Sequence, residues 1–123
     1  MPTIPAAMLK QLYKRGSLRN AGPGWEFAMR NHLAAATLVG IGLTLDGVEV
    51  APAAITVSQP EANVAVRAGA ITPYTPIRFP TQIATMVQVA GAPLDPGSHD
   101  LAIRADTREI GLVTIAVSDT VAE

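Results

Sequence analysis

The sequence contains no cysteine. A chain without thiols forms no disulfide, binds no metal through thiolates and uses no cysteine nucleophile. Aromatic residues are also few, with one Trp, two Tyr and two Phe among 123 residues. This number is too small for the stacking platforms with which many proteins bind single-stranded nucleic acid or sugars. A carbohydrate-binding module that works through exposed aromatic side chains is therefore disfavoured.

Charged residues are scarce and unevenly distributed. They make up 15% of the chain and leave a formal net charge of −1, which gives no electrostatic reason to expect nucleic acid or an anionic membrane as a partner. The first forty residues hold five cations and one acid, and the remainder holds four cations and nine acids. Either the two ends of the chain lie side by side and these charges mix, or the first part forms a basic edge that docks on an acidic partner or an anionic ligand.

Long hydrophobic runs are missing as well. The most apolar stretch, residues 33–45, is interrupted by Gly40 and Gly42 and is too short to span a bilayer. The N-terminal residues 1–16 do not resemble a secretory signal, in which positive charge precedes the apolar run, because Lys10 and Lys14 follow the apolar residues. We therefore expect a cytoplasmic protein with no membrane-spanning segment.

The chain is punctuated throughout by ten glycines and ten prolines. Between these breaks apolar and polar residues alternate, which is the pattern of half-buried strands. Short strands are predicted at residues 25–33, 39–45, 48–50, 55–57, 62–67, 81–89, 101–105 and 110–117. About eight short strands predict an all-β fold, an antiparallel β-sandwich of the immunoglobulin/fibronectin-like or jelly-roll-like kind. We expect one β-sandwich domain over residues 1–123.

Two connections and the N-terminal segment carry local signals. Asp46 and Gly47 predict a tight hairpin turn between two strands, because both residue types accept positive φ angles. Residues 92–99, which include Pro96 and Gly97, predict a second turn. Residues 5–13 could form either a helix or a strand, and we favour the strand because the residues that follow look extended.

The alternation over residues 25–33 separates a core side from an outer side. We expect four apolar residues to be buried on one sheet face: Trp25, Phe27, Met29 and Leu33. The opposite side carries a polar strip that we expect to lie outward and that could contact a partner: Glu26, Arg30 and His32. The competing interpretation of this strip is an ordinary solvated sheet face.

Catalytic and metal-binding motifs are weak or missing. The two histidines, His32 and His99, are far apart in sequence, whereas a zinc site needs three or four ligands; His99 follows a turn and is expected to be a solvated residue at a strand start. Only Glu26 and Glu49 are carboxylates placed within predicted strands, which disfavours a two-carboxylate glycosidase site. No serine lies in a G-x-S-x-G elbow. We therefore assign no catalytic residue and no metal ligand.

Four stretches of the chain look familiar as a set. They are LKQLYKRGSLRN at residues 9–20, GWEFAMRNHL at 24–33, PGSH at 96–99 and EIGLV at 109–113, and the block from Ser17 to Asn31 is the most specific. Together they resemble the small β-subunit family of bacterial C-glycoside deglycosidases. Many members of this family have no assigned function, and some short relatives are labelled hydroxymethylglutaryl-CoA reductase.

The resemblance implies a non-catalytic role. It implies a small β-sandwich that packs on a larger TIM-barrel α-subunit, which binds a divalent metal and supplies the catalytic residues. The complex would be a carbon–carbon lyase that cleaves 3-oxo-C-glycosides, and this chain would hold no cofactor. A nicotinamide-dependent reductase needs a cofactor fold, a general acid and a substrate site, and a chain of 123 residues without a βαβ pattern is not expected to hold these.

The sequence is compatible with two classes of function. The first is an accessory subunit, and the second is a stand-alone small ligand-binding domain or minor enzyme of unknown substrate. We also expect partner binding or self-association, because a surface with few charges does little to keep copies apart and a sandwich has edge strands that need covering.

Overall fold

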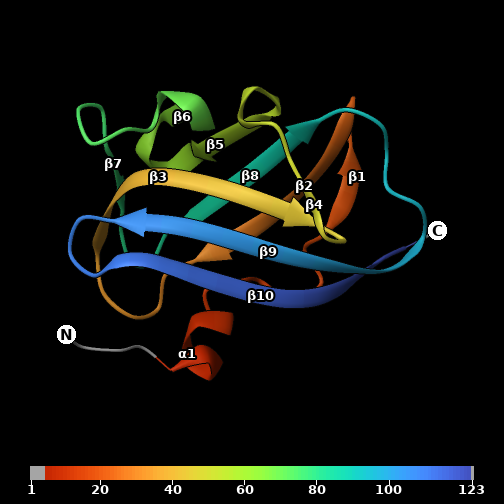
Figure 1. Cartoon of the computed structure of the whole chain (residues 1–123), viewed down its shortest axis with the longest axis horizontal. Coiled ribbons are helices and arrows are strands. Elements are labelled where there is room, and N and C mark those ends of the chain that lie inside the picture. Colours follow the sequence, from red (N-terminus) through yellow and green to blue (C-terminus); the bar gives the residue numbers. More distant parts are fainter. Residues whose placement is uncertain (1–4, 123) are drawn as a thin grey trace.

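The computed structural model describes residues 5–122, which form two β-sheets packed face to face (Figure 1). All strand ladders in this part of the chain are antiparallel. The predicted all-β antiparallel sandwich is therefore confirmed. The described residues contain no helix that is long and apolar enough to cross a membrane.

The first sheet has five strands in the order β1-β2-β8-β5-β6. Their bounds are β1 (Arg19–Ala21), β2 (Gly24–Arg30), β8 (Ala84–Ala90), β5 (Ile55–Gln59) and β6 (Val64–Arg67). Strands far apart in sequence are neighbours here, because β2 pairs directly with β8 and β8 with β5.

The second sheet has the order β10-β9-β3-β4, and β7 also pairs with β3. Its strands are β10 (Gly111–Val121), β9 (Gly97–Thr107), β3 (Ala36–Leu45), β4 (Val48–Glu49) and β7 (Ile77–Phe79). Short 3-10 turns lie at η1 (Pro52–Ala54), η2 (Pro60–Ala62) and η3 (Ala68–Ala70). Residues 5–122 thus hold ten strands instead of about eight, because β1 and β7 are too short to show an alternating pattern.

The core lies between the two sheets and follows the period-two pattern of the strands. Phe27, Val57 and Val87 are fully buried from the first sheet, and Leu43 and Ile103 meet them from the second. In the sheet of β3 and β9 the register shifts between Leu38 and Gly40. This irregularity places one extra residue in β3, so that the inward-facing positions before and after it are not separated by the usual two residues.

The predicted hairpin at Asp46-Gly47 is confirmed. The two residues have φ angles of 50° and 81° and connect β3 to β4. A two-residue turn with both central φ angles positive suits the twist of the strands that it joins.

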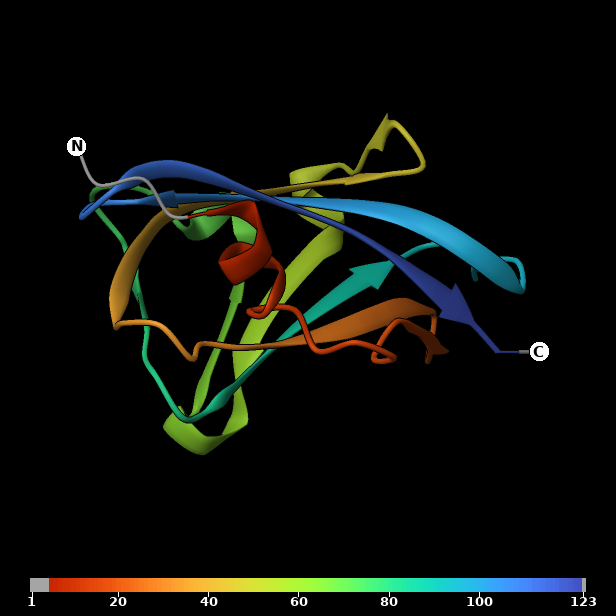
Figure 2. The same cartoon turned by 90° about the horizontal axis from the view of Figure 1, so that it is seen from below.

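The N-terminal segment is a helix, and the predicted strand at residues 5–13 was wrong. Helix α1 spans Ala6–Lys10, and its segment is rich in Ala, Leu, Met and Lys, which favour helices. Leu9 and Leu12 are buried, and α1 packs against β10. Figure 2 shows α1 between the layer of β10 and the layer of β2, where it closes part of the open side of the sandwich. The basic N-terminal segment thus lies beside a strand from the acidic part of the chain.

Candidate functional site

The three residues of the predicted polar strip have different environments. Arg30 and His32 are exposed as expected, and Arg30 donates a hydrogen bond of 2.6 Å to the carbonyl of Gln82. Glu26 lies on the outer face of the sheet as predicted, but it is covered there and only 6% exposed. β2 ends at Arg30, so His32 lies beyond the strand register. The role of the strip in docking stays a prediction.

Glu26 is covered by its neighbours on the outer face of the first sheet. It lies directly opposite Arg19 on β1 and Gln88 on β8. The Arg19 guanidinium donates two bonds of 2.9 and 2.7 Å to Glu26 Oε2, and Gln88 lies 3.5 Å from Oε1. Sequence reasoning could not see this, because one partner comes from a strand sixty residues away along the chain.

His99 is not the solvated residue that was expected, since only 12% of its side chain is exposed. Its Nδ1 lies 2.6 Å from Asp46 Oδ2, and its Nε2 lies 2.7 Å from the carbonyl oxygen of Asp95. Both partners are acceptors, so the ring is best served when both nitrogens carry protons. The Asp95 carbonyl and the Asp46 carboxylate accordingly raise the pKa of His99. His99 therefore connects the β3–β4 turn to the loop that precedes β9.

The two histidines do not come together. His32 precedes β3, whereas His99 contacts Asp46 just after the end of β3, and a ten-residue strand is about 30 Å long. Over residues 5–122 no group of three or more His, Asp or Glu side chains is placed to hold a metal ion.

A second polar cluster, around Asp119, was not found from the sequence. Asp119 Oδ2 accepts hydrogen bonds from the Tyr13 hydroxyl at 2.5 Å, from the Gly16 amide at 2.9 Å and from the Leu18 amide at 3.4 Å. Burial raises the pKa of Tyr13, and its bond to Asp119 raises it further. Burial also opposes ionisation of Asp119, but the bonds that it accepts outweigh this and lower its pKa. This cluster ties the chain after α1 to β10.

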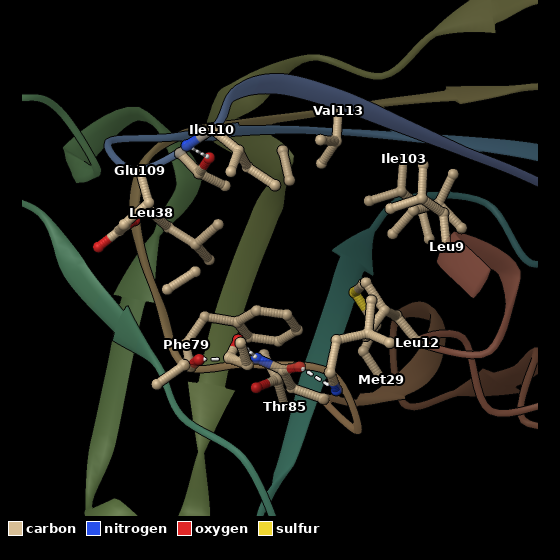
Figure 3. Close-up of a pocket in the computed structure, with 18 of the residues that line it drawn as sticks. Leu9, Leu12, Met29, Leu38, Phe79, Thr85, Ile103, Glu109, Ile110 and Val113 are labelled. Atoms are coloured by element: carbon tan, nitrogen blue, oxygen red, sulfur yellow. Dashed lines mark hydrogen bonds between the residues drawn. The ribbon is translucent and has the colours of Figure 1, made fainter. Parts of the chain in front are cut away.

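A cavity of about 160 Å³ with mostly apolar lining lies between the sheets. One wall comes from the first sheet through Met29 and Thr85, and the other from β3, β9 and β10. Leu9 and Leu12 close it from the side of α1 (Figure 3). The further lining is mostly aliphatic: Leu33, Ala34, Ala35, Ala36, Leu38, Ile41, Ile103, Ala105, Ile110, Val113, Ile115 and the ring of Phe79.

The polar residues beside the cavity have partners within the protein. The buried Asn31 amide donates to the carbonyls of Ala34 and Phe79 at 2.7 and 3.0 Å and accepts from the Leu33 amide at 3.0 Å. Thr107 Oγ1 donates to the carbonyl of Gly111 and accepts from the Ile110 amide.

Glu109, at the rim, accepts bonds of 2.8 Å from both the amide and the hydroxyl of Thr37. These bonds lower the pKa of Glu109, so its carboxylate is ionised at neutral pH. With their polar neighbours satisfied in this way, the walls present hydrocarbon to the space between them.

The space opens to solvent at its rim, where Ala34, Ala35 and Glu109 are exposed, and its apolar walls lose contact with water when an apolar group fills it. Only an indirect signal for this cavity is present in the sequence: the small residues Ala34, Ala35 and Ala36, which follow the buried Asn31. Its chemistry is that of a binding site for apolar groups.

Comparison with known protein families identifies the chain over nearly its whole length. The sequence model described as hydroxymethylglutaryl-CoA reductase, N-terminal domain, matches residues 8–122. The chain belongs to this family. The match runs from α1 to the last strand, so both sheets, the cavity and the His99 and Asp119 clusters lie within the family's domain. This match agrees with the label hydroxymethylglutaryl-CoA reductase, which some short relatives of the C-glycoside deglycosidase β-subunits carry. No curated protein matches the sequence.

Proposed function

We propose that this chain is a non-catalytic accessory subunit that packs on a larger partner, in the manner of the β-subunit of C-glycoside deglycosidases. The partner would be a TIM-barrel α-subunit that binds a divalent metal and cleaves 3-oxo-C-glycosides. The observation that carries the proposal concerns the block at residues 17–31, which carries the resemblance. Most side chains of this block pack or form hydrogen bonds within the sandwich.

The polar residues of the block make internal hydrogen bonds. Ser17 Oγ accepts from the Ala28 amide at 3.0 Å and donates to the Lys14 carbonyl at 2.6 Å. The Asn20 amide exchanges two bonds with the backbone of Leu94, at 2.9 and 2.6 Å. A block that is used in this way supports a scaffold role, whereas a catalytic motif would hold groups ready for a substrate.

The apolar residues of the block fill the core, as predicted. Trp25, Phe27 and Met29 are buried on the inner face of β2. Leu33, the fourth residue of that prediction, lies beyond the strand and is half-buried at the cavity. The motif therefore specifies how the first sheet packs, which any partner-binding role requires.

The surface offers features that suit a protein partner. Tyr74 is 94% exposed and Leu112 is 65% exposed, and both are large side chains that lose unfavourable contact with water when they are covered. Arg30 and His32 are exposed as well and offer polar groups to a partner. We assign these residues to partner contacts, because interfaces use both large apolar side chains and polar ones.

The name of the family raises hydride transfer as an activity, and we propose that this chain does not perform it. Nicotinamide dinucleotides bind at the carboxyl ends of parallel strands, where a glycine-rich turn leads into a helix. Here the ladders of residues 5–122 are antiparallel, and the described helix α1 has five residues. We expect no cofactor in this chain and place the divalent metal on the partner.

Reconstitution tests the proposal. The chain is purified alone and also co-expressed with a candidate TIM-barrel isomerase-like partner, sought among the neighbouring genes, and turnover of a 3-oxo-C-glycoside is measured with added Mn²⁺. We expect turnover only in the presence of the partner, together with co-purification of the two chains. Replacing His32 and His99 together by alanine should reduce turnover modestly, through docking or folding. Loss by several orders of magnitude would instead indicate a catalytic base or metal ligand.

Two results would contradict the accessory role. One is turnover by the isolated chain, and the other is stoichiometric zinc or manganese bound to the isolated chain and lost in the His32→Ala or His99→Ala variant. The second candidate function is a stand-alone ligand-binding domain. The observation that favours it is the apolar cavity. A folded monomer that shows no turnover and does not bind the TIM-barrel protein, but binds a small ligand, would support that alternative.

A further inference from the structure

We propose that the cavity between the two sheets is a binding site for one small, neutral, apolar molecule of about the size of a benzene ring. The inference concerns the isolated chain and does not depend on the proposed partner.

The shape of the cavity supports a single compact ligand. Its volume of about 160 Å³ is close to that of an apolar protein cavity of about 150 Å³ known to stay dry and to bind benzene. Leu9, Phe79 and Ile103 are buried lining residues, whereas Ala34, Ala35 and Glu109 are exposed. The exposed residues mark the entrance, where the loop before β3 meets the turn between β9 and β10.

The walls are held in place by contacts that do not involve a ligand. The Asn31 side chain connects the loop at the entrance to β7, through its bonds to the carbonyls of Ala34 and Phe79. On the opposite wall, the register shift in β3 brings both Leu38 and Ile41 to the cavity. Buried amide bonds and a strand irregularity therefore hold the backbone of these walls in place without a ligand.

The chemistry of the lining selects a neutral ligand. The hydrogen-bonding groups of Asn31, Thr107 and Glu109 are already engaged with the protein. A charged or strongly polar group that entered would lose its hydration without gaining a partner. The ionised Glu109 carboxylate at the rim further disfavours an anion. Figure 3 shows the aliphatic side chains and the ring of Phe79 around the central space.

Titration of the isolated chain with benzene tests the site. We expect saturable NMR shifts confined to methyl groups that line the cavity, such as those of Leu38, Ile103 and Ile115, together with a rise in melting temperature. Ala105→Ile should fill the space from the inner face of β9 and weaken benzene binding at least tenfold. Ala102→Ile is the matched control. Ala102 lies on β9 like Ala105 and pairs with Thr44 of β3 and Ala116 of β10, but it is not part of the lining. This variant should bind benzene like the original chain.

A second filling variant keeps the test decisive if Ala105→Ile does not fold. Ala36→Leu enters the cavity from the half-buried rim and should also weaken binding at least tenfold. Benzoate, which adds one negative charge to the same ring, should bind at least tenfold more weakly than benzene. The proposal is overturned by the absence of saturable shifts up to the solubility of benzene, by both filled variants binding benzene as tightly as the original chain, or by benzoate binding as tightly as benzene. None of these results bears on reconstitution with the partner.

Discussion

The Asp119 side chain forms three hydrogen bonds between the N-terminal segment and the second sheet. One of its oxygens accepts bonds from the hydroxyl of Tyr13 and from the amides of Gly16 and Leu18. Asp119→Ala leaves these donors without their partner and should lower the free energy of unfolding by about 2 kcal/mol, and Tyr13→Phe by about 1 kcal/mol. Urea unfolding at pH 7 measures both changes.

The same residue contributes to acid sensitivity. The pKa of Asp119 is lowered in the folded chain, so its stabilisation is complete above its unfolded pKa and is lost as the pH falls through the folded pKa. The difference between Asp119→Ala and the original chain should therefore shrink at acid pH. Asp106→Ala, at an exposed acid of β9, is the control and should stay within about 0.5 kcal/mol. A similar loss in both variants would contradict the assignment.

Gly24 is required by a close approach between two strands. A Cβ at this position would lie 1.8 Å from the carbonyl oxygen of Val89 on the neighbouring strand, and backbone cannot move aside as a flexible side chain can. Gly24→Ala should therefore force β2 and β8 apart and cost about 3 kcal/mol. Gly69→Ala is the matched control, because nothing lies within 4 Å of its Cβ. Thermal unfolding of both variants measures the difference, and equal melting temperatures would refute the argument.

At the scale of elements, His99 of β9 connects its own strand to the β3–β4 turn and to the loop that contains Asp95. Its ring contacts Asp46 in that turn and the carbonyl of Asp95, and the Asp46 carboxylate also accepts a hydrogen bond of 2.8 Å from the Asp100 amide. The His99 bond, with that amide bond, lowers the pKa of Asp46, while the pKa of His99 is raised. The charged pair therefore forms only between the two folded pKa values.

This pair predicts the sign of a pH effect on stability. Because the folded pKa of His99 is raised above its unfolded value, its stabilisation is complete below about pH 6.5 and is lost as the pH rises through the folded pKa. The melting temperature should fall on that alkaline side, and His99→Gln should abolish the fall. His32→Gln, at the exposed histidine, should leave it unchanged. An unchanged pH profile in His99→Gln would contradict the assignment.

At the scale of the whole molecule, the core depends on a few large side chains. Trp25 is buried and stacks at 6.4 Å from the ring of Phe27. Trp25→Ala should cost about 3–5 kcal/mol, which is a large share of the stability of an ordinary domain. Denaturant unfolding followed by circular dichroism checks this, and a loss below about 1 kcal/mol would show that Trp25 is not a core anchor.

The whole molecule also has one long strand at the end of a sheet. β10 has 11 residues without proline and is the last strand of the second sheet, and long edge strands tend to pair with other chains. We expect self-association or capture by a partner, and light scattering at micromolar concentration measures the first. A single species of 12.8 kDa would rule out the homo-oligomer.

The sequence by itself determined the class of the fold. The alternation around Phe27, the spacing of turn residues and the Asp46-Gly47 hairpin predicted a sandwich of short antiparallel strands, and these predictions were confirmed. They succeeded because side-chain period and turn conformation are local properties, which a few neighbouring residues decide. The local signal failed at α1, where a short segment had no periodic pattern long enough to separate helix from strand.

The tertiary structure alone decided the features that depend on which elements meet. Glu26 is buried because β1 and β8 bring Arg19 and Gln88 to its sides. His99 is covered because the end of β3 lies beside the start of β9. The cavity exists because a register shift in β3 and the buried Asn31 amide hold two sheets and a helix around one space. Each of these features depends on contacts between residues tens of positions apart. The local pattern of residues along the chain therefore cannot predict these contacts.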